Sequence, residues 1–251
     1  VFLLVVIVCI SFFIIFFYRH PRIRIEWDVS LEVVWETKLN SSIIVDVKYA
    51  WIGNSFVFLV TGQNIVALVD PLDGDIVRFA NPLGRMDIIY GFAAVGDINC
   101  DGKPEIVVTI FNATAYYRYF LDENTSGRVI ALDAETLELL WVSNISIPYA
   151  SYVIPTLADV NNDGALEILI QDLYSTVYCI GHDGALIWQK NLSNGKTRYP
   201  APRSVTIGDV NNDGFCDVII GVPGANSSKG QVQVIFGNPT NLAPAGPDWV
   251  I

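Results

Sequence analysis

The chain has 251 residues, enough for one large domain with a sizeable core. Its formal net charge is −11, and such an acidic surface repels phosphate backbones, so we expect no nucleic-acid partner. Hydrophobic residues make up 52% of the chain, more than in an ordinary soluble domain. Part of this excess lies in an uncharged run at the N-terminus.

That run, Val1–Tyr18, reads VFLLVVIVCISFFIIFFY and contains no Pro or Gly. As a helix rising ~1.5 Å per residue it would be ~27 Å long, close to the thickness of a bilayer core. A signal-peptide core is the alternative, but no small-residue cleavage site follows it. We therefore expect residues 1–18 to be a transmembrane anchor that contacts the membrane, and residues 19–32 to be a juxtamembrane linker.

The flanking residues give conflicting signals about orientation. Arg19, Arg22 and Arg24 follow the apolar run, and positive flanks usually stay cytoplasmic. Six N-x-S/T sequons lie downstream, and such sequons mark surface loops of secreted glycoproteins. They are Asn40, Asn112, Asn124, Asn144, Asn191 and Asn226. The sequons favour a single-pass cell-surface protein whose main domain is extracellular, and a basic flank ahead of Val1 would remove the conflict.

Three segments of the chain repeat one another: VGDINCDGKPEIVV from Val95, LADVNNDGALEILI from Leu157 and IGDVNNDGFCDVII from Ile207. Their first aspartates are 62 and 50 residues apart, a period typical of a propeller blade of about four strands. A second repeated element, an apolar run, an acidic turn and another apolar run, predicts a β-hairpin. It occurs at Asn64–Phe79, Arg128–Trp141 and Thr176–Gln189.

These two alternating elements predict an all-β fold, a β-propeller over residues 33–251. We expect the blades at residues 33–80, 90–142, 152–190 and 203–236, the first of them without an acidic loop. The last residues, NLAPAGPDWVI, show no clear closing strand. Since closed propellers have about 4–8 blades, we expect these four blades to be part of a larger propeller.

The acidic loops have the donor spacing of calcium sites, with side-chain oxygens at positions 1, 3, 5 and 9 and Gly at position 6. The predicted ligands are Asp97, Asn99, Asp101 and Glu105 in the first loop, Asp159, Asn161, Asp163 and Glu167 in the second, and Asp209, Asn211, Asp213 and Asp217 in the third. The backbone carbonyls at position 7 belong to Lys103, Ala165 and Phe215. The set holds no His or Cys, which disfavours zinc.

An EF-hand shares the first half of this pattern but needs Glu at position 12, where this chain has Val108, Ile170 and Ile220. A strand, not a helix, therefore follows each loop. The alternative is an Asx-rich turn that binds nothing. Repetition in three equivalent contexts favours Ca²⁺, and nine of the 26 Asp and Glu residues lie in these loops.

The pattern D-x-N-x-D-G-x-x-[DE] followed by an apolar strand resembles the FG-GAP repeat of integrin α-subunit propellers. The third copy, Gly208–Gly237, shows it best, with a turn at Gly221–Gly224 and a closing Phe236–Gly237. The resemblance covers residues 40–251 and implies a seven-bladed propeller, calcium at the loops on one face and adhesion or protein binding on the other. The hairpins resemble those of quinoprotein (PQQ-type) propellers.

Signals for catalysis are few. His20 adjoins the apolar run and His182 lies at a hairpin tip, no G-x-S-x-G occurs, and Gly195-Lys196-Thr197 lacks the earlier glycine of a P-loop. Cys9, Cys100, Cys179 and Cys216 form no CxxC pair. Cys9 lies in the apolar run, and the other three are expected to be mostly buried thiols. We favour a non-enzymatic module for an extracellular protein or glycan ligand. An enzyme on a calcium propeller, a polysaccharide lyase or a PQQ-type dehydrogenase, is the alternative.

Overall fold

The computed structural model describes residues 2–7, 33–85, 88–112, 126–148, 153–192, 204–222, 230–237 and 249–250. Within these ranges the chain forms nineteen β-strands and no helix. Neighbouring strands pair antiparallel throughout. The all-β class predicted from the sequence is confirmed.

Four consecutive sheets make up most of the described residues, and each is built from strands in chain order. Blade 1 holds β3 (Ile44–Ile52), β4 (Ser55–Gly62), β5 (Ile65–Val69) and β6 (Ile76–Ala80). Blade 2 holds β7 (Ile88–Gly96), β8 (Glu105–Asn112), β9 (Ser126–Asp133) and β10 (Leu139–Val142), with β11 (Ile147–Pro148) paired to β9. Blade 3 holds β12 (Thr156–Ala158), β13 (Glu167–Gln171), β14 (Thr176–Ile180) and β15 (Leu186–Asn191). Blade 4 holds β16 (Thr206–Gly208), β17 (Asp217–Val222), β18 (Gln231–Ile235) and β19 (Trp249–Val250).

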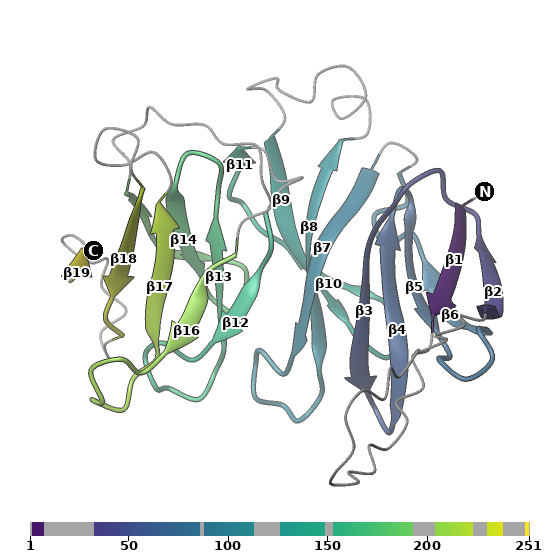
Figure 1. The fold of residues 1–251 in the computed structure, drawn as a ribbon, viewed down its shortest axis with the longest axis horizontal. Coiled ribbons are helices and arrows are strands. Elements are labelled where there is room, and N and C mark those ends of the chain that lie inside the picture. Colours follow the sequence, from purple (N-terminus) through teal and green to yellow (C-terminus); the bar gives the residue numbers. More distant parts are fainter. Residues whose placement is uncertain are drawn as a thin grey trace, which may run out of the picture.

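The blades follow one another side by side in chain order, as the blades of a β-propeller do (Figure 1). Successive side chains of a strand point to opposite faces, and the buried strands are apolar on both faces, so that blades 2 and 3 each pack on two neighbouring blades. In β8, for example, Ile106 and Val108 pack against blade 1, whereas Val107 and Phe111 pack against blade 3. The cores therefore lie between the blades.

Two predicted boundaries were wrong. Residues 33–39, placed in the first blade by the sequence, instead form β2 (Val33–Leu39), which pairs with β1 (Phe2–Ile7) in a separate two-stranded sheet. Blade 1 begins at Ile44, and its first two strands are joined by a tight turn at Gly53–Asn54. At the other end of the chain, β19 pairs with β18 and supplies the fourth strand that the sequence did not show.

The helix expected over Val1–Tyr18 is also wrong where the structure can be compared with it. Phe2–Ile7 forms a strand, and its β-branched residues Val5, Val6 and Ile7 suit a strand better than a helix. Residues 8–18 and the whole of the 19–32 linker lie outside the described ranges. In the described part of the chain there is no helix of the length and apolarity needed to cross a bilayer.

Candidate metal-binding loops

Each acidic loop connects the first strand of a blade to its second strand. Residues 97–105, 159–167 and 209–217 join β7 to β8, β12 to β13 and β16 to β17. The three loops lie at the same end of the propeller, along the lower edge of the view (Figure 1). The structure thus gathers the three predicted sites on one side of the molecule.

Within the third loop, the carboxylate of Asp209 organises the turn. Its Oδ1 accepts the backbone N–H of Asp213 at 3.1 Å, and its Oδ2 accepts that of Gly214 at 3.0 Å. Asn211 Oδ1 also accepts the Asp213 N–H, at 3.0 Å, and Asp213 Oδ1 accepts the N–H of Phe215 at 2.9 Å. Positions 1, 3 and 5 therefore all turn their oxygens toward the inside of the loop.

The other two loops repeat these bonds at equivalent positions. The first aspartate, Asp97 or Asp159, accepts the N–H groups of positions 5 and 6, and the residue at position 7 donates to position 5. The backbone repeats as well, because positions 4 and 6 have positive φ in every loop. These residues are Cys100 (φ 60°) and Gly102 (φ 86°), Asn162 (φ 60°) and Gly164 (φ 96°), and Asn212 (φ 61°) and Gly214 (φ 91°). Asn and Gly adopt positive φ readily, whereas Cys seldom does, so Cys100 is an unusual residue at this position.

The carboxylate at position 9 is buried in all three loops. Glu105 and Glu167 are 3% exposed and Asp217 is fully buried. Each accepts the backbone N–H of position 2, which belongs to Ile98, Val160 or Val210, at 2.8–3.0 Å. Burial raises the pKa of the Glu105 and Glu167 carboxyls; the accepted N–H opposes this, and the loop aspartates raise it further. A cation in the loop would therefore stabilise the ionised form of these buried carboxyls.

The donor chemistry of the loops fits a hard cation. Each loop offers two aspartates, one asparagine, one buried carboxylate and a position-7 carbonyl, all oxygen donors of the kind Ca²⁺ takes. An oxygen that accepts one N–H keeps a second lone pair. In the described residues, no three His, Cys, Asp or Glu side chains make up a metal site by themselves. Ca²⁺ takes six to eight oxygens, so a cation in such a loop would also draw on the Asn amide oxygen and the position-7 carbonyl.

Neighbouring loops touch one another, which the sequence did not reveal. The N–H of Leu166 in the second loop donates to the carbonyl of Ile98 in the first at 3.2 Å, and the Cys100 thiol donates to the Gly164 carbonyl. In blade 4 the N–H of Gly237 donates to Asp217 Oδ1 at 3.0 Å. A Cβ at Gly237 would lie 2.8 Å from the carbonyl of Val160 in the second loop. The closing Gly of the third repeat thus lies between two loops.

The thiols differ in their surroundings. Cys179 is buried as predicted, and burial raises its pKa, whereas Cys100 is exposed and Cys216 is half-buried. The prediction of buried thiols therefore holds for Cys179 and is wrong for Cys100. All three are free, and Cys9 lies outside the described residues.

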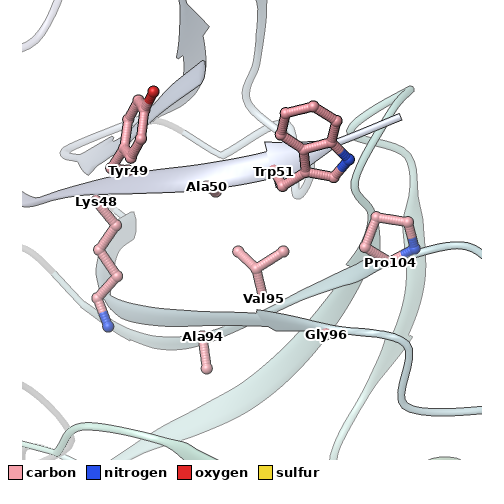
Figure 2. Close-up of a pocket in the computed structure, with 8 residues that line it drawn as sticks. All are labelled: Lys48, Tyr49, Ala50, Trp51, Ala94, Val95, Gly96 and Pro104. Carbon is pink, nitrogen blue, oxygen red and sulfur yellow. The ribbon is translucent and has the colours of Figure 1, made fainter. Parts of the chain in front are cut away.

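A cavity of about 350 Å³ lies between β3 and β7 (Figure 2). Its charged lining residue is Lys48, whose ammonium donates to the carbonyl of Ala93 and lies 3.7 Å from Asp46 Oδ2. Asp46 in turn accepts the N–H of Ala93 at 3.2 Å. This pair holds the bulge of β7 between Tyr90 and Ala93. Lys48 and Asp46 therefore stabilise the backbone of β7 at its bulge.

Comparison with known proteins finds similarity to a repeat family and to an integrin α chain. The FG-GAP repeat family matches residues 201–235, which include the third acidic loop. Integrin alpha-8 of Mus musculus is 27% identical over 183 residues, a match that covers 64% of this chain and 16% of that protein. The chain therefore spans about a sixth of the length of this curated relative.

Three solved structures are similar at low identity. The match to the Dos1 propeller covers 88% of this chain and 50% of that chain, with a TM-score of 0.49 and 9% identity. BamB from Moraxella catarrhalis (TM-score 0.35, 16% identity) is covered over 63% by 81% of this chain. The Vibrio cholerae biofilm matrix protein Bap1 (TM-score 0.33, 15% identity) is covered over 38% by 83%. The blade architecture itself follows from the strand pairing of the present chain.

Proposed function

We propose that this chain, which is similar to the FG-GAP repeat over residues 201–235 and to an integrin α chain, is a calcium-binding β-propeller that acts outside the cell in adhesion or ligand recognition rather than in catalysis. The observation that carries the proposal is the identity of the three acidic loops. They have the same side-chain donors, the same N–H acceptors and the same two positive-φ positions, on successive blades. A turn that served only to reverse the chain would need none of this agreement.

Calcium would act on the stability of the blades. Each loop holds three carboxylates within nine residues, and they repel one another without a counter-charge. A bound Ca²⁺ supplies that counter-charge and ties the ends of two neighbouring strands together. The protein's part is to hold Asp209, Asn211 and Asp213 on one side of the loop and Asp217 beneath it, as the N–H bonds of the loop do.

An extracellular location is supported by the sequons and by the likeness to an integrin α chain. Asn40, Asn144 and Asn191 are exposed, as glycosylation requires, and Asn112 is half-buried. Asn124 and Asn226 lie outside the described residues. A protein or glycan ligand stays a prediction, whereas membrane attachment has no support from Phe2–Ile7, which forms a strand. The number and spread of exposed sequons favour a secreted or surface-displayed domain.

Differential scanning calorimetry with and without a chelator tests the proposal. At a free Ca²⁺ concentration 100 times the dissociation constant, one site contributes ~2.7 kcal/mol. That corresponds to a rise in Tm of about 5–10 °C for a chain of this size. Asp209→Asn should lose much of the rise in Tm that Ca²⁺ at the third loop produces. Asp183→Asn, in the Asx turn between β14 and β15, should show the same rise in Tm with Ca²⁺ as the parent. An unchanged Tm on chelation would contradict the proposal.

A further inference from the structure

Two hydrogen bonds join the first acidic loop to the second, and both involve residues next to the predicted cation ligands. In one of them, the N–H of Leu166 donates to the carbonyl of Ile98 at 3.2 Å. Leu166 stands between the ligand positions Ala165 and Glu167. Ile98 directly follows Asp97, the first ligand position of its own loop. This bond therefore connects the backbones of the two donor sets without an intervening strand.

The second bond joins the two loops at Cys100 and Gly164. The Cys100 thiol donates to the carbonyl of Gly164, and a Cβ on Gly164 would lie 3.9 Å from the Cys100 sulfur. Each of these two residues stands between two predicted ligands of its own loop. A change in the shape of either loop would therefore be felt by the ligands of the other.

Ile98 also holds the buried carboxylate of its own loop. Its N–H donates to Glu105 Oε2 at 2.9 Å, while its carbonyl accepts the N–H of Leu166. The Ile98 side chain is 1% exposed and belongs to the core cluster between blades 2 and 3, against which Leu166 packs. A displacement of Leu166 in the second loop would thus move the residue that orients Glu105 in the first.

The second and third loops share the packing of this arrangement but not its hydrogen bonds. Val160, at position 2 of the second loop, donates its N–H to Glu167 at 3.0 Å. Its side chain lies in the core cluster against which Cys216, at position 8 of the third loop, packs. Among the residues that the structure describes, the hydrogen bonds between acidic loops are confined to the first and second. These two loops are therefore the more tightly linked pair.

Charge and order would affect a pair of bound cations in opposite directions. Each loop holds three carboxylates, so a Ca²⁺ in one loop reduces the negative charge that attracts the next ion. Salt screens this effect over about 8 Å at physiological ionic strength. The bonds between the loops are direct contacts, and they require both loops to be closed. A cation that orders one loop therefore lowers the cost of ordering its neighbour.

We propose that the first and second loops bind Ca²⁺ cooperatively, each raising the affinity of the other through the Leu166–Ile98 and Cys100–Gly164 bonds. This inference rests on the calcium binding proposed above. The effect is reciprocal, as any coupling between two binding sites must be. We expect a factor of about fivefold, the lower end of the range for coupled sites. Cys100 is a positioning residue here, since its thiol bonds the carbonyl of Gly164.

Isothermal titration calorimetry of loop variants at physiological ionic strength tests the coupling. A loop is disabled by Asp→Asn at positions 1 and 5, such as Asp209→Asn with Asp213→Asn in the third. Each Asn keeps an Oδ1 that accepts an N–H of the loop, and circular dichroism checks that the fold is retained. With the third loop disabled, the overall constant for two Ca²⁺ should exceed the product of the two single-loop constants about fivefold.

The first and third loops are the matched control pair. With the second loop disabled, their overall constant should equal the product of their single-loop constants. An excess of one for the first and second loops, or an equal excess for both pairs, would overturn the coupling and leave calcium binding itself intact. A parent chain that bound no Ca²⁺ would overturn the proposed function as well.

Substitutions of Cys100 test its bond separately, in the chain whose third loop is disabled. Cys100→Ser keeps a donor for the Gly164 carbonyl and should retain most of the fivefold excess. Cys100→Ala removes the donor and should reduce the excess to about twofold. Both variants keep a non-Gly residue at a φ of 60°, so their calcium-free melting temperatures should agree. An equal excess in the two variants would overturn the positioning role of Cys100.

Discussion

The indole N–H of Trp141 in blade 2 donates a hydrogen bond of 2.8 Å to the backbone carbonyl of His182 in blade 3. The ring lies against Gly184 of the same turn, where a Cβ would come within 2.7 Å of Trp141 Cε3. His182 thus acts through its backbone, in agreement with its interpretation as a turn residue. A tryptophan of an outer strand fixes the hairpin turn of the next blade, and this link recurs between Trp35 and Pro71.

Trp141→Phe isolates the hydrogen bond of this link, because the phenyl ring keeps part of the packing. We expect the free energy of unfolding to fall by about 1 kcal/mol or less, the net value of one solvent-accessible hydrogen bond. Urea unfolding followed by circular dichroism measures it. Trp51→Phe is the matched control, since Trp51 is 54% exposed. If both variants unfolded at the same urea concentration, the link would have no energetic role.

Gly184→Ala tests the packing side of the same contact. Gly184 has a φ of 81°, and its added Cβ would meet the Trp141 ring. We expect a loss of about 2 kcal/mol from strain and displaced packing. Gly208→Ala, where no atom lies within 4 Å of the added Cβ, should stay within about 0.5 kcal/mol of the parent. Thermal unfolding of the two variants side by side decides the point; similar melting temperatures would contradict it.

Cys100 occupies a position where the other two loops have asparagine. Its φ is 60°, a conformation that Asn adopts more readily than most residues. We expect Cys100→Asn to leave stability unchanged or to raise it by up to about 1 kcal/mol. The opposite change, Asn212→Ala, should cost about 1 kcal/mol. Chemical denaturation in the presence of chelator separates this backbone effect from any effect of Ca²⁺, and a stabilising Asn212→Ala would refute it.

Asp172 predicts a pH dependence of stability that is independent of the acidic loops. Burial raises the pKa of its carboxyl, against the hydrogen bonds that it accepts from the N–H of Thr176, the Tyr178 hydroxyl and the N–H of Tyr174. A folded-state pKa above the unfolded value means that the folded protein binds the proton more tightly. The contribution of Asp172 to the free energy of unfolding is therefore complete below its unfolded pKa, and it is lost as the pH rises through its folded pKa.

Asp172→Asn removes that loss. The free energy of unfolding of the variant minus that of the parent should rise as the pH is raised above about 4, the pKa of an unfolded aspartate. Urea titrations at several pH values measure the difference, which cancels the shared response of the loop carboxylates. Tyr178→Phe removes one hydrogen bond that stabilises the ionised form, so its stability should fall more steeply with pH than that of the parent. A difference independent of pH for Asp172→Asn would contradict the prediction.

The sequence predicted the elements that are local in the chain. The acidic loops are closed by bonds that span two to seven residues, such as Gly214 to Asp209 and Val210 to Asp217, so the spacing of Asp, Asn and Gly carries the information. The β9–β10 and β14–β15 hairpins formed where their acidic turns indicated. Predictions that required a distant partner were less accurate: β2 looked like the first strand of blade 1 until its pairing with β1 was known.

By itself, then, the amino-acid sequence determined the repeat, the all-β class and the side-chain oxygens in each loop, because backbone turns and strand periodicity depend on near neighbours. The tertiary structure decided which strands share a sheet, that the three loops lie at one end with the first two in contact, and that Tyr49, Trp51 and Phe56 are exposed. These features depend on packing between residues tens of positions apart. Such packing is set by the geometry of the assembled sheets, and no local pattern of residues encodes it.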